Sequence, residues 1–281
     1  MRIIESKLIE ETVKELFIKS NYTLSCGATE CIKRARENER DTLAKSVLST
    51  LEDNLVAARE IDVPICQDTG MAVIFVEIGN EVHIAGDDLT TAVNEGVRRA
   101  YIDGYMRLSV VGDPFYERKN TNDNTPAIIY TEFVKGDKIK LTALPKGFGS
   151  ENMSALKMFT PSATEDDIVG FVVDTVRRAG SNPCPPIMVG VGIGGTFDYS
   201  AVLSKKALAR DPDDAHPDPR YAALEARMLE EINKLGIGPQ GFGGDTTALG
   251  VNIEKYPTHI AGLPVAVNIC CHVMRHLSKI I

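Results

Sequence analysis

The sequence contains no apolar run near the roughly 18 residues that a membrane-spanning helix needs. Its first residues, Met1 to Glu5, become acidic too early for a secretory signal peptide. Positive charge is not in excess, since 31 Lys and Arg residues stand against 39 Asp and Glu residues, a net charge of −8. This balance argues against nucleic acid or an anionic membrane as the main partner, although local arginines can still bind an anionic substrate. We therefore expect a cytoplasmic protein.

The sequence also lacks any Cys-x-x-Cys pair, so zinc ribbons, thioredoxin-type sites and ferredoxin-type clusters are without their usual signature. Disulfides are not expected in a compartment where thiols stay reduced. Two of the six cysteines, Cys26 and Cys31, lie in helical patterns and are interpreted as packing or surface residues. The others leave a possible set of three separate thiols: Cys66, Cys184, and Cys270 or Cys271. Ordinary iron–sulfur clusters have four Cys ligands, so three would leave one iron open.

The pattern of apolar residues predicts a mixed α+β fold. Helical spacing covers most of residues 5–59 and recurs at about 87–105, 164–178 and 221–235. Strands are expected at 71–78, 127–134, 138–144 and 264–269, with the second and third joined as a hairpin by Lys135-Gly136-Asp137. There is no internal repeat and no clear linker. We expect one domain over 1–281, in which a helical subregion at about 1–62 packs on an α/β subregion at about 63–281 with a mixed sheet.

The first cysteine of interest lies in the stretch Val63-Pro64-Ile65-Cys66-Gln67-Asp68-Thr69-Gly70, directly before a strongly apolar segment. A thiol on the turn into a strand, beside an amide and a carboxylate, suits a metal ligand with its own supporting groups. A buried cysteine on a turn closed by Gly70 explains the same eight residues equally well.

The second cysteine stretch is Asn182-Pro183-Cys184-Pro185-Pro186, in which prolines fix φ and remove backbone donors. It leads into an apolar strand where Gly190, Gly192 and Gly195 match the G-x-G-x-x-G pattern, with Asp211 near the expected distance. A dinucleotide site is therefore an alternative. Its position two-thirds along the chain, without evident βαβ repeats, argues against it.

Two glycine-rich turns could bring backbone amides close to a ligand. One is Lys146-Gly147-Phe148-Gly149-Ser150-Glu151-Asn152, which either binds a carboxylate at a helix start or simply connects a strand to a helix. The other runs from Gly236 to Thr247, and its first nine residues include five glycines. The last apolar strand is closed by Cys270-Cys271-His272.

Three of these stretches resemble one known family. Cys66-Gln67-Asp68-Thr69-Gly70, the Cys184 peptide with Gly192-Ile193-Gly194-Gly195-Thr196, and Gly243-Gly244-Asp245-Thr246-Thr247 are similar to motifs of the alpha subunit of iron–sulfur hydro-lyases. These are the class I fumarases and the L(+)-tartrate dehydratases. The resemblance covers nearly the whole chain, and its motifs occur in order.

The resemblance implies a [4Fe–4S] cluster held by three cysteines, with the fourth iron open to substrate. Cys66 and Cys184 carry over directly, and Cys271 is favoured over Cys270 as the residue four before Arg275. It further implies catalytic roles for Asp68 and His259, and substrate contacts from Gln67, Arg107, Gly147 and Gly149. Hydration of a C=C bond between carboxylates needs a Lewis acid, an acid–base group and cations, which this set would supply. Without the resemblance, the arginine would be read as solvated and the histidine as structural.

The sequence stops ten residues after Cys271, without the second domain of the single-chain family members. We therefore expect a separate beta subunit and an assembly of two alpha and two beta chains, with the N-terminal helices and the loop at 113–125 as candidate contacts. The expected reaction is reversible hydration of fumarate to L-malate, and the alternative within the family is dehydration of L(+)-tartrate to oxaloacetate. More remote alternatives are a nucleotide-dependent oxidoreductase and a non-catalytic metal-binding subunit.

Overall fold

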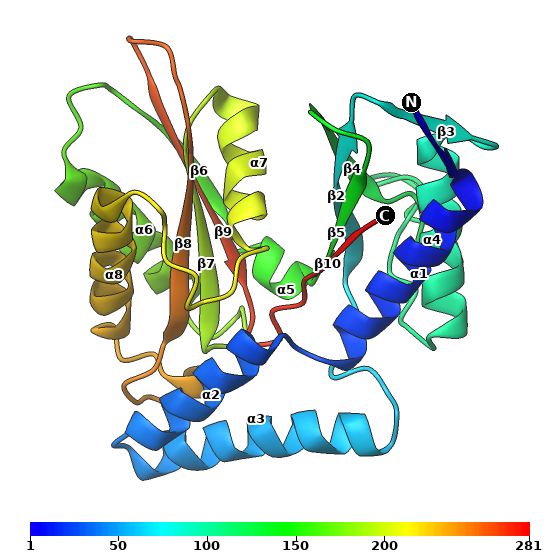
Figure 1. The fold of residues 1–281 in the computed structure, drawn as a ribbon. Coiled ribbons are helices and arrows are strands. Elements are labelled where there is room, and N and C mark those ends of the chain that lie inside the picture. Colours follow the sequence, from blue (N-terminus) through cyan, green and yellow to red (C-terminus); the bar gives the residue numbers. More distant parts are fainter. The chain divides into compact units, whose positions relative to one another are not determined.

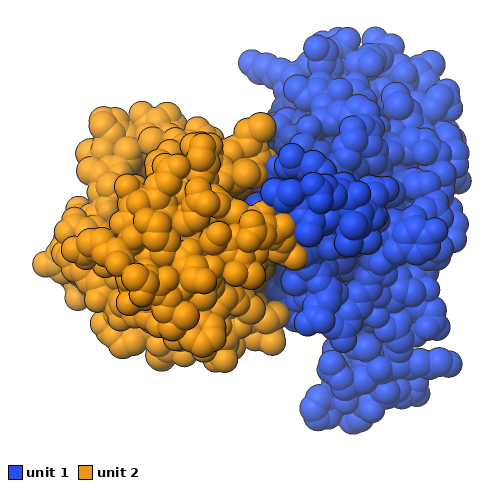
Figure 2. All heavy atoms as spheres, turned by 90° about the horizontal axis from the view of Figure 1, so that it is seen from below, with its two compact units in different colours: residues 1–24, 55–148, 275–281 blue, residues 25–54, 149–274 orange.

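The computed structural model describes residues 1–281, which divide into two compact units made of non-contiguous segments (Figure 2). Unit 1 comprises Met1–Leu24, Leu55–Phe148 and Arg275–Ile281, and unit 2 comprises Ser25–Asn54 and Gly149–Met274. Because the chain passes between the units several times, no single stretch of the sequence acts as the linker. None of the helices combines the length and apolarity that a membrane span requires.

Unit 1 contains a four-stranded sheet, a two-stranded sheet and two helices (Figure 1). The larger sheet has the order β10 (Leu277–Ile280), β5 (Ile139–Lys146), β2 (Met71–Gly79) and β4 (Ile128–Val134). Strand β5 is antiparallel to both neighbours, whereas β4 is parallel to β2. The small sheet pairs β1 (Arg2–Glu5) with β3 (Val82–Ala85) in parallel. The helices are α1 (Ser6–Tyr22) and α4 (Leu89–Asp103).

The core of unit 1 forms where the apolar stripes of α1 and α4 meet the sheet. Apolar residues spaced three and four apart place one face of each helix toward the core, as the sequence periodicity predicts. The buried members include Ile9, Val13 and Phe17 of α1, Val93 and Val97 of α4, and Ile74 and Val76 of β2. Strand β2 is buried along almost its whole length, which is typical of a central strand.

The expected hairpin between residues 127–134 and 138–144 is wrong, although both strands exist. Strands β4 and β5 pair with opposite edges of β2 and not with each other. The connection at Lys135–Lys138 passes over the end of β2, where Gly79 N donates to Lys138 O at 2.8 Å. A Cβ on Gly79 would lie 2.4 Å from Gly136 O, so glycine is required there. The apolar β2 takes the centre because it has the most surface to bury.

Unit 2 is built on a second four-stranded sheet, with the order β6 (Ala155–Phe159), β9 (Leu263–Cys270), β7 (Ile187–Gly194) and β8 (Ala248–Tyr256). Strand β9 is antiparallel to β6 and β7, and β7 is parallel to β8. The helices are α2 (Cys26–Asn38), α6 (Glu165–Ala179), α7 (Phe197–Ala207) and α8 (Pro219–Asn233), with the short turn η1 (Pro239–Gly241). Two elements cross the division between the units: α3 (Thr42–Glu60) and α5 (Phe148–Glu151).

The mixed α+β fold is confirmed, as are most of the predicted elements. A capping box closes the start of α6, since Thr164 Oγ1 accepts from Asp167 N while Asp167 accepts from Thr164 N. The helical stretch at 1–62, expected as one subregion, is divided: α1 belongs to unit 1 and α2 to unit 2.

The glycines of β7 are explained by helix packing. A Cβ on Gly190 would lie 2.1 Å from Ser204 O, and one on Gly192 would lie 2.0 Å from Ser200 O, both in α7. A dinucleotide fingerprint places its first glycines in the turn after the strand. Here Gly190 and Gly192 both lie inside β7, so the structure gives no support to the alternative of a nucleotide-dependent oxidoreductase.

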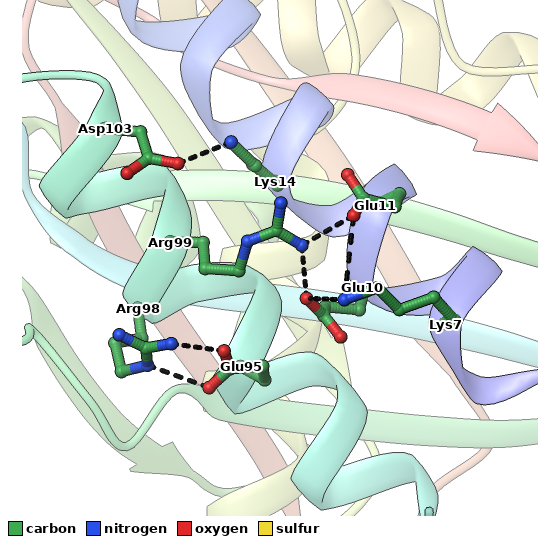
Figure 3. Close-up of polar contacts among 8 residues, drawn as sticks. All are labelled: Lys7, Glu10, Glu11, Lys14, Glu95, Arg98, Arg99 and Asp103. Atoms are coloured by element: carbon green, nitrogen blue, oxygen red, sulfur yellow. Dashed lines mark hydrogen bonds and ion pairs between the residues drawn. The ribbon is translucent and has the colours of Figure 1, made fainter. Parts of the chain in front are cut away.

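Helices α1 and α4 of unit 1 are joined by a network of charged side chains (Figure 3). Arg99 hydrogen-bonds to Glu10, and its Nη1 lies 2.6 Å from Glu11 Oε1. Lys7 Nζ donates to Glu10 Oε1 at 2.7 Å. Burial acts to raise the pKa of Glu10, but hydrogen bonds from Lys7 and Arg99 outweigh it and hold the pKa below the usual 4.5. Glu10 is therefore stabilised as the carboxylate.

We expect Arg99→Met to lower the free energy of unfolding at pH 7 by about 1 to 2 kcal/mol, because nearly buried Glu10 loses a cation. A depressed pKa contributes stability above the unfolded value and loses it as the pH falls. The difference from wild type should therefore shrink below about pH 4, which urea unfolding at pH 7 and pH 3.5 can measure.

Arg98→Met is the matched control, because Arg98 pairs with Glu95 on the same helix and both side chains are more than a third exposed. Such a pair contributes at most about 0.5 kcal/mol. Equal losses in the two variants would contradict the role given to Glu10.

Candidate functional site

The loop Cys66–Gly70, which precedes β2 in unit 1, is held by side chains from distant parts of the unit. The hydroxyl of Tyr101 lies 3.0 Å from Thr69 O and 2.9 Å from Gly70 O. Asn124 Nδ2 donates to Gly70 O at 3.2 Å. Tyr101 is fully buried, and burial raises the pKa of its hydroxyl, so the group stays protonated as a donor. The loop therefore has a fixed backbone.

Gly70 allows this loop to turn tightly into β2. Its φ is +78°, in the left-handed region, and an added Cβ would lie 2.8 Å from the backbone of Lys146. Only glycine satisfies both conditions. The motif ends in glycine because a neighbouring strand passes directly beside the turn.

The carboxylate of Asp68 is oriented by main-chain donors. Gly70 N donates to Oδ1 at 3.0 Å and Phe148 N donates to Oδ2 at 3.2 Å. A Cβ on Gly147 would lie 3.0 Å from Oδ2, so the second glycine turn lies against this carboxylate. Unit 1 thus brings together Asp68 and Gly147. Both oxygens retain a further lone pair that can accept a proton.

A buried arginine braces the same loop. Arg275 is 3% exposed, and its Nη1 donates to Asp68 O at 2.6 Å and to Asn21 Oδ1 at 2.8 Å. Asn21 in turn accepts from Ile65 N through its backbone oxygen at 2.9 Å. Arg275 therefore ties the loop to the end of α1.

The structure also brings Arg107 to this loop. Arg107 N donates to Thr69 Oγ1 at 2.9 Å, which fixes the start of the arginine's segment. Its side chain is exposed and has no ion-pair partner in the chain, and Gln67 is likewise exposed. Both side chains are free to contact a ligand.

In unit 2, the structure places the Cys184 loop beside the segment that follows β9. His272 N donates to Cys184 O at 3.4 Å, and His272 Nδ1 lies 3.0 Å from the same oxygen. Cys184 is exposed and has a φ of +55°. Since His272 follows Cys271 directly, two of the three expected ligand residues lie on adjacent segments.

Cys270 and Cys271 differ in their surroundings. Cys270 is the last residue of β9, pairs in register with Met188 and is 4% exposed. Cys271 follows the strand and is half-buried. Of the two thiols, that of Cys271 is the more accessible to a metal.

The Gly243–Thr247 turn is fixed by an acidic residue from α2's end. Glu39 is 3% exposed, and its carboxylate accepts from Asp245 N at 3.0 Å and Thr246 N at 3.2 Å. Arg40 binds the Asp245 carboxylate through two nitrogens, each at 2.7 Å. Asp245 is thus committed to a bidentate ion pair that shapes the turn.

Within unit 2, His259 lies far from the Cys184 and Cys271 segments, whereas Gly149 lies next to Asn182 at the start of the Cys184 stretch. His259 is exposed on the turn between β8 and β9, where its Nδ1 accepts from Ala261 N at 3.2 Å. Strand β9 separates that turn from Cys271 by roughly 23 Å, given the usual rise per residue. Gly149 is exposed, and a Cβ there would meet only Asn182 O, at 3.8 Å.

Comparison with known proteins decides the family. The family described as Fumarate hydratase (Fumerase) matches residues 10–279, nearly the whole chain. The chain belongs to the fumarate hydratase family. It is accordingly an enzyme of the hydro-lyase class.

Named relatives agree with this membership. A protein of Methanocaldococcus jannaschii named "Putative L(+)-tartrate dehydratase subunit alpha" is 41% identical over 276 residues, or 96% of each chain. Proteins named "L(+)-tartrate dehydratase subunit alpha" from Escherichia coli O157:H7 and Escherichia coli K12 are 33% and 32% identical over 242 residues, covering 85% of this chain and 80% of theirs.

The thiols of this fumarate hydratase family member suit a soft metal centre. No cysteine forms a disulfide. The structure shows no group of three His, Cys, Asp or Glu side chains close enough together to hold an ion. In unit 2 the adjacent Cys184 and Cys271 segments each carry a thiol, and in unit 1 the braced Cys66 loop carries another; sulfur is the donor type that iron prefers in clusters.

Sequence reasoning missed the residues that brace the two loops. Each of these residues contacts the backbone of a motif from a distant position in the sequence, and none lies in a recognisable motif itself. They are Glu39, Tyr101, Asn124, Gln240, His272 and Arg275. Two features of the sequence could have indicated such residues: Gln240 is the single glutamine within the glycine-rich turn, and Arg275 follows Cys271 by four residues.

We expect Gly147→Ala to reduce hydro-lyase kcat about tenfold or more, because its Cβ would displace the Asp68 carboxylate by a few tenths of an ångström. Steady-state kinetics on the assembled enzyme would measure this. Gly170→Ala in α6 is the control, since its Cβ would meet nothing within 4 Å. If both variants keep the wild-type kcat, Asp68 does not need its observed position.

Proposed function

We propose that this chain is the alpha subunit of a [4Fe–4S]-dependent hydro-lyase that catalyses reversible hydration of fumarate to L-malate. The observation that carries the proposal is the pairing of Cys184 with the Cys271 segment in a member of the fumarate hydratase family. The oriented carboxylate two residues after Cys66 supports it.

Cys66, Cys184 and Cys271 would hold the cluster as thiolates. When bound, such a cluster supplies an open iron that acts as a Lewis acid on the substrate's hydroxyl group. Three ligands from well-separated positions leave that corner to the substrate. The accessible position of Cys271, compared with the buried Cys270, supports its choice as the third ligand.

Asp68 would transfer the proton. In the dehydration direction its carboxylate takes a proton from the carbon next to a substrate carboxylate, and in hydration it returns that proton. Hydrogen bonds from Gly70 N and Phe148 N keep the carboxylate from rotating. The Asp68 carboxylate therefore needs little reorientation to reach the transition state.

The substrate carboxylates would be held by Arg107 and nearby polar groups. The guanidinium of Arg107 is exposed and without an ion-pair partner, and a guanidinium binds a carboxylate through two parallel hydrogen bonds. Gln67 can donate through its side-chain amide, and Gly147 and Gly149 through their backbones. These four contacts are proposed from the family resemblance together with the position of the Cys66 loop.

The role of His259 stays a prediction of the resemblance. The length of β9 separates it from Cys271 of its own unit, so we assign the proton transfer described above to Asp68 alone.

We further propose a separate beta subunit and an assembly of two alpha and two beta chains in the cytoplasm. The relatives carry the words "subunit alpha" in their names, which supports a second subunit. A small dicarboxylate would be the substrate.

Dehydration of L(+)-tartrate to oxaloacetate is the second candidate. The observation that favours it is the name shared by the three relatives. Both substrates are four-carbon dicarboxylates, and Arg107 and Asp68 could serve either reaction.

Replacing the proposed ligands tests the cluster. We expect Cys66→Ser, Cys184→Ser and Cys271→Ser each to abolish iron and sulfide incorporation under anaerobic conditions, because each removes a thiolate. Cys31→Ser and Cys270→Ser, which replace the two buried thiols, are the controls and should retain it. Loss of the cluster in Cys270→Ser with retention in Cys271→Ser would contradict our assignment.

An activity assay tests the reaction itself. We expect the anaerobically purified alpha–beta enzyme to hydrate fumarate, with kcat/KM for fumarate above that for dehydration of L(+)-tartrate. The reverse preference would establish the second candidate. Failure to act on either substrate, with an intact cluster, would contradict both.

A further inference from the structure

Gln240 adopts a backbone conformation that its side chain disfavours. Its φ is +54°, in a turn where Gly238 and Gly241 also have positive φ. Side chains rarely occupy this region, and glycine does so without strain. A residue kept there against that preference is expected to make contacts that glycine cannot make.

Those contacts reach the Cys184 loop. Gln240 N donates to Pro185 O at 2.8 Å, and Gln240 Nε2 donates to the same oxygen at 2.7 Å. Both lone pairs of one carbonyl are thereby used by one residue. Gln240 Nε2 also lies 3.3 Å from His272 Nδ1.

His272 continues the connection to the other thiol. Its Nδ1 lies 3.0 Å from Cys184 O, and a carbonyl oxygen can only accept, so Nδ1 carries the proton. The nearby Gln240 Nε2 makes its shorter bond to Pro185 O, and the carbonyl of Cys184 therefore sets the tautomer. His272 follows Cys271 and thus links the two thiol-bearing segments.

The composition of the loop explains why its carbonyls are the points of attachment. Pro183, Pro185 and Pro186 have no backbone N–H, so neighbouring groups must bind the loop mainly through oxygen. Gln240 and His272 donate to two successive carbonyls, those of Pro185 and Cys184. Together with the bond from Cys184 N to Ser181 O, these two bonds hold the backbone from which the Cys184 side chain projects.

We propose that Gln240 and His272 are positioning residues that hold Cys184 and Cys271 in their ligating arrangement before the cluster binds. This inference rests on the proposed function, in which both cysteines are ligands. Ordering the two segments during folding removes that entropic cost from metal binding, so the cluster is held longer.

The test is Gln240→Gly in the full alpha–beta enzyme. The variant keeps the main-chain bond, relieves the positive φ and removes only the side-chain donor. We expect the cluster to be lost to an iron chelator about five- to tenfold faster, as for one missing hydrogen bond. We expect the thermal midpoint of the cluster-free protein to be unchanged or higher, because strain is relieved.

Two outcomes would overturn the inference. One is a rate of cluster loss within about twofold of wild type, which is too small for a lost hydrogen bond. The other is a lower thermal midpoint in parallel with faster loss, which would indicate general destabilisation.

Arg118→Gly is the matched control. Arg118 also has positive φ, at +48°, and its side chain also donates to a carbonyl, Pro114 O at 2.5 Å. It lies in unit 1, outside both thiol-bearing segments, so the rate of cluster loss should match wild type.

His272 offers a second, conservative pair of variants. An Asn side chain can place its amide nitrogen where His272 Nδ1 lies, whereas Ala cannot. We expect His272→Asn to retain the cluster near the wild-type rate and His272→Ala to lose it faster. Equal behaviour of the two variants would overturn the role of the Cys184 bond.

Hydrogen exchange in the cluster-free chain separates this inference from the proposed function. Gln240→Gly should speed exchange of the His272 amide, which donates to Cys184 O. A wild-type enzyme that takes up no cluster would refute the proposed function, and the exchange result would still decide whether Gln240 holds the loop. Unchanged exchange would refute the positioning role.

Discussion

The thiol-bearing loops of this chain keep their shape because side-chain donors bind their main-chain carbonyls. In unit 1, Tyr101 binds Thr69 O and Gly70 O while Arg275 binds Asp68 O. In unit 2, Gln240 binds Pro185 O. Loops rich in Pro and Gly cannot satisfy their polar groups through a helix or sheet, so other parts of the fold must do so. The positions of the thiols and of the Asp68 carboxylate depend on these bonds.

Much of the fold was predictable because local physics decided it. Strand β2 and helix α6 had strong apolar patterns and, for α6, a capping box at Thr164. The predicted hairpin of β4 and β5 was wrong because the turn signal at Lys135–Asp137 gives no indication that β2 lies between these two strands in the sheet. Pairing β2 with both buries more apolar surface than a local hairpin would, and that comparison is not visible in a short window of sequence.

The sequence singles out the thiol-bearing loops and Asp68 as candidates, but it does not indicate the residues that hold those loops in place. Cys66, Asp68 and Cys184 occur in motifs whose composition is unusual for packing residues. Gln240 and Arg275 act over long sequence separations through single hydrogen bonds to backbone oxygen. Such bonds depend on tertiary contacts, so residue type and spacing give no direct indication of them. The glycines of β7 show the opposite error: their spacing resembles a dinucleotide-binding motif, but they are needed for the close packing of α7 on the strand.

A net charge of −8 does not prevent a protein from binding an anion, because binding depends on the local potential. Most arginines are neutralised by nearby carboxylates, as Arg99 is by Glu10 and Glu11. Arg107 differs, because its backbone is fixed to Thr69 while its guanidinium has no acidic partner. Distant surface carboxylates are screened within about 8–10 Å at physiological ionic strength, so they would oppose a bound anion only weakly. The segment anchored to the Asp68 loop at Thr69 therefore carries an exposed guanidinium that no acidic side chain neutralises, whatever the sign of the net charge.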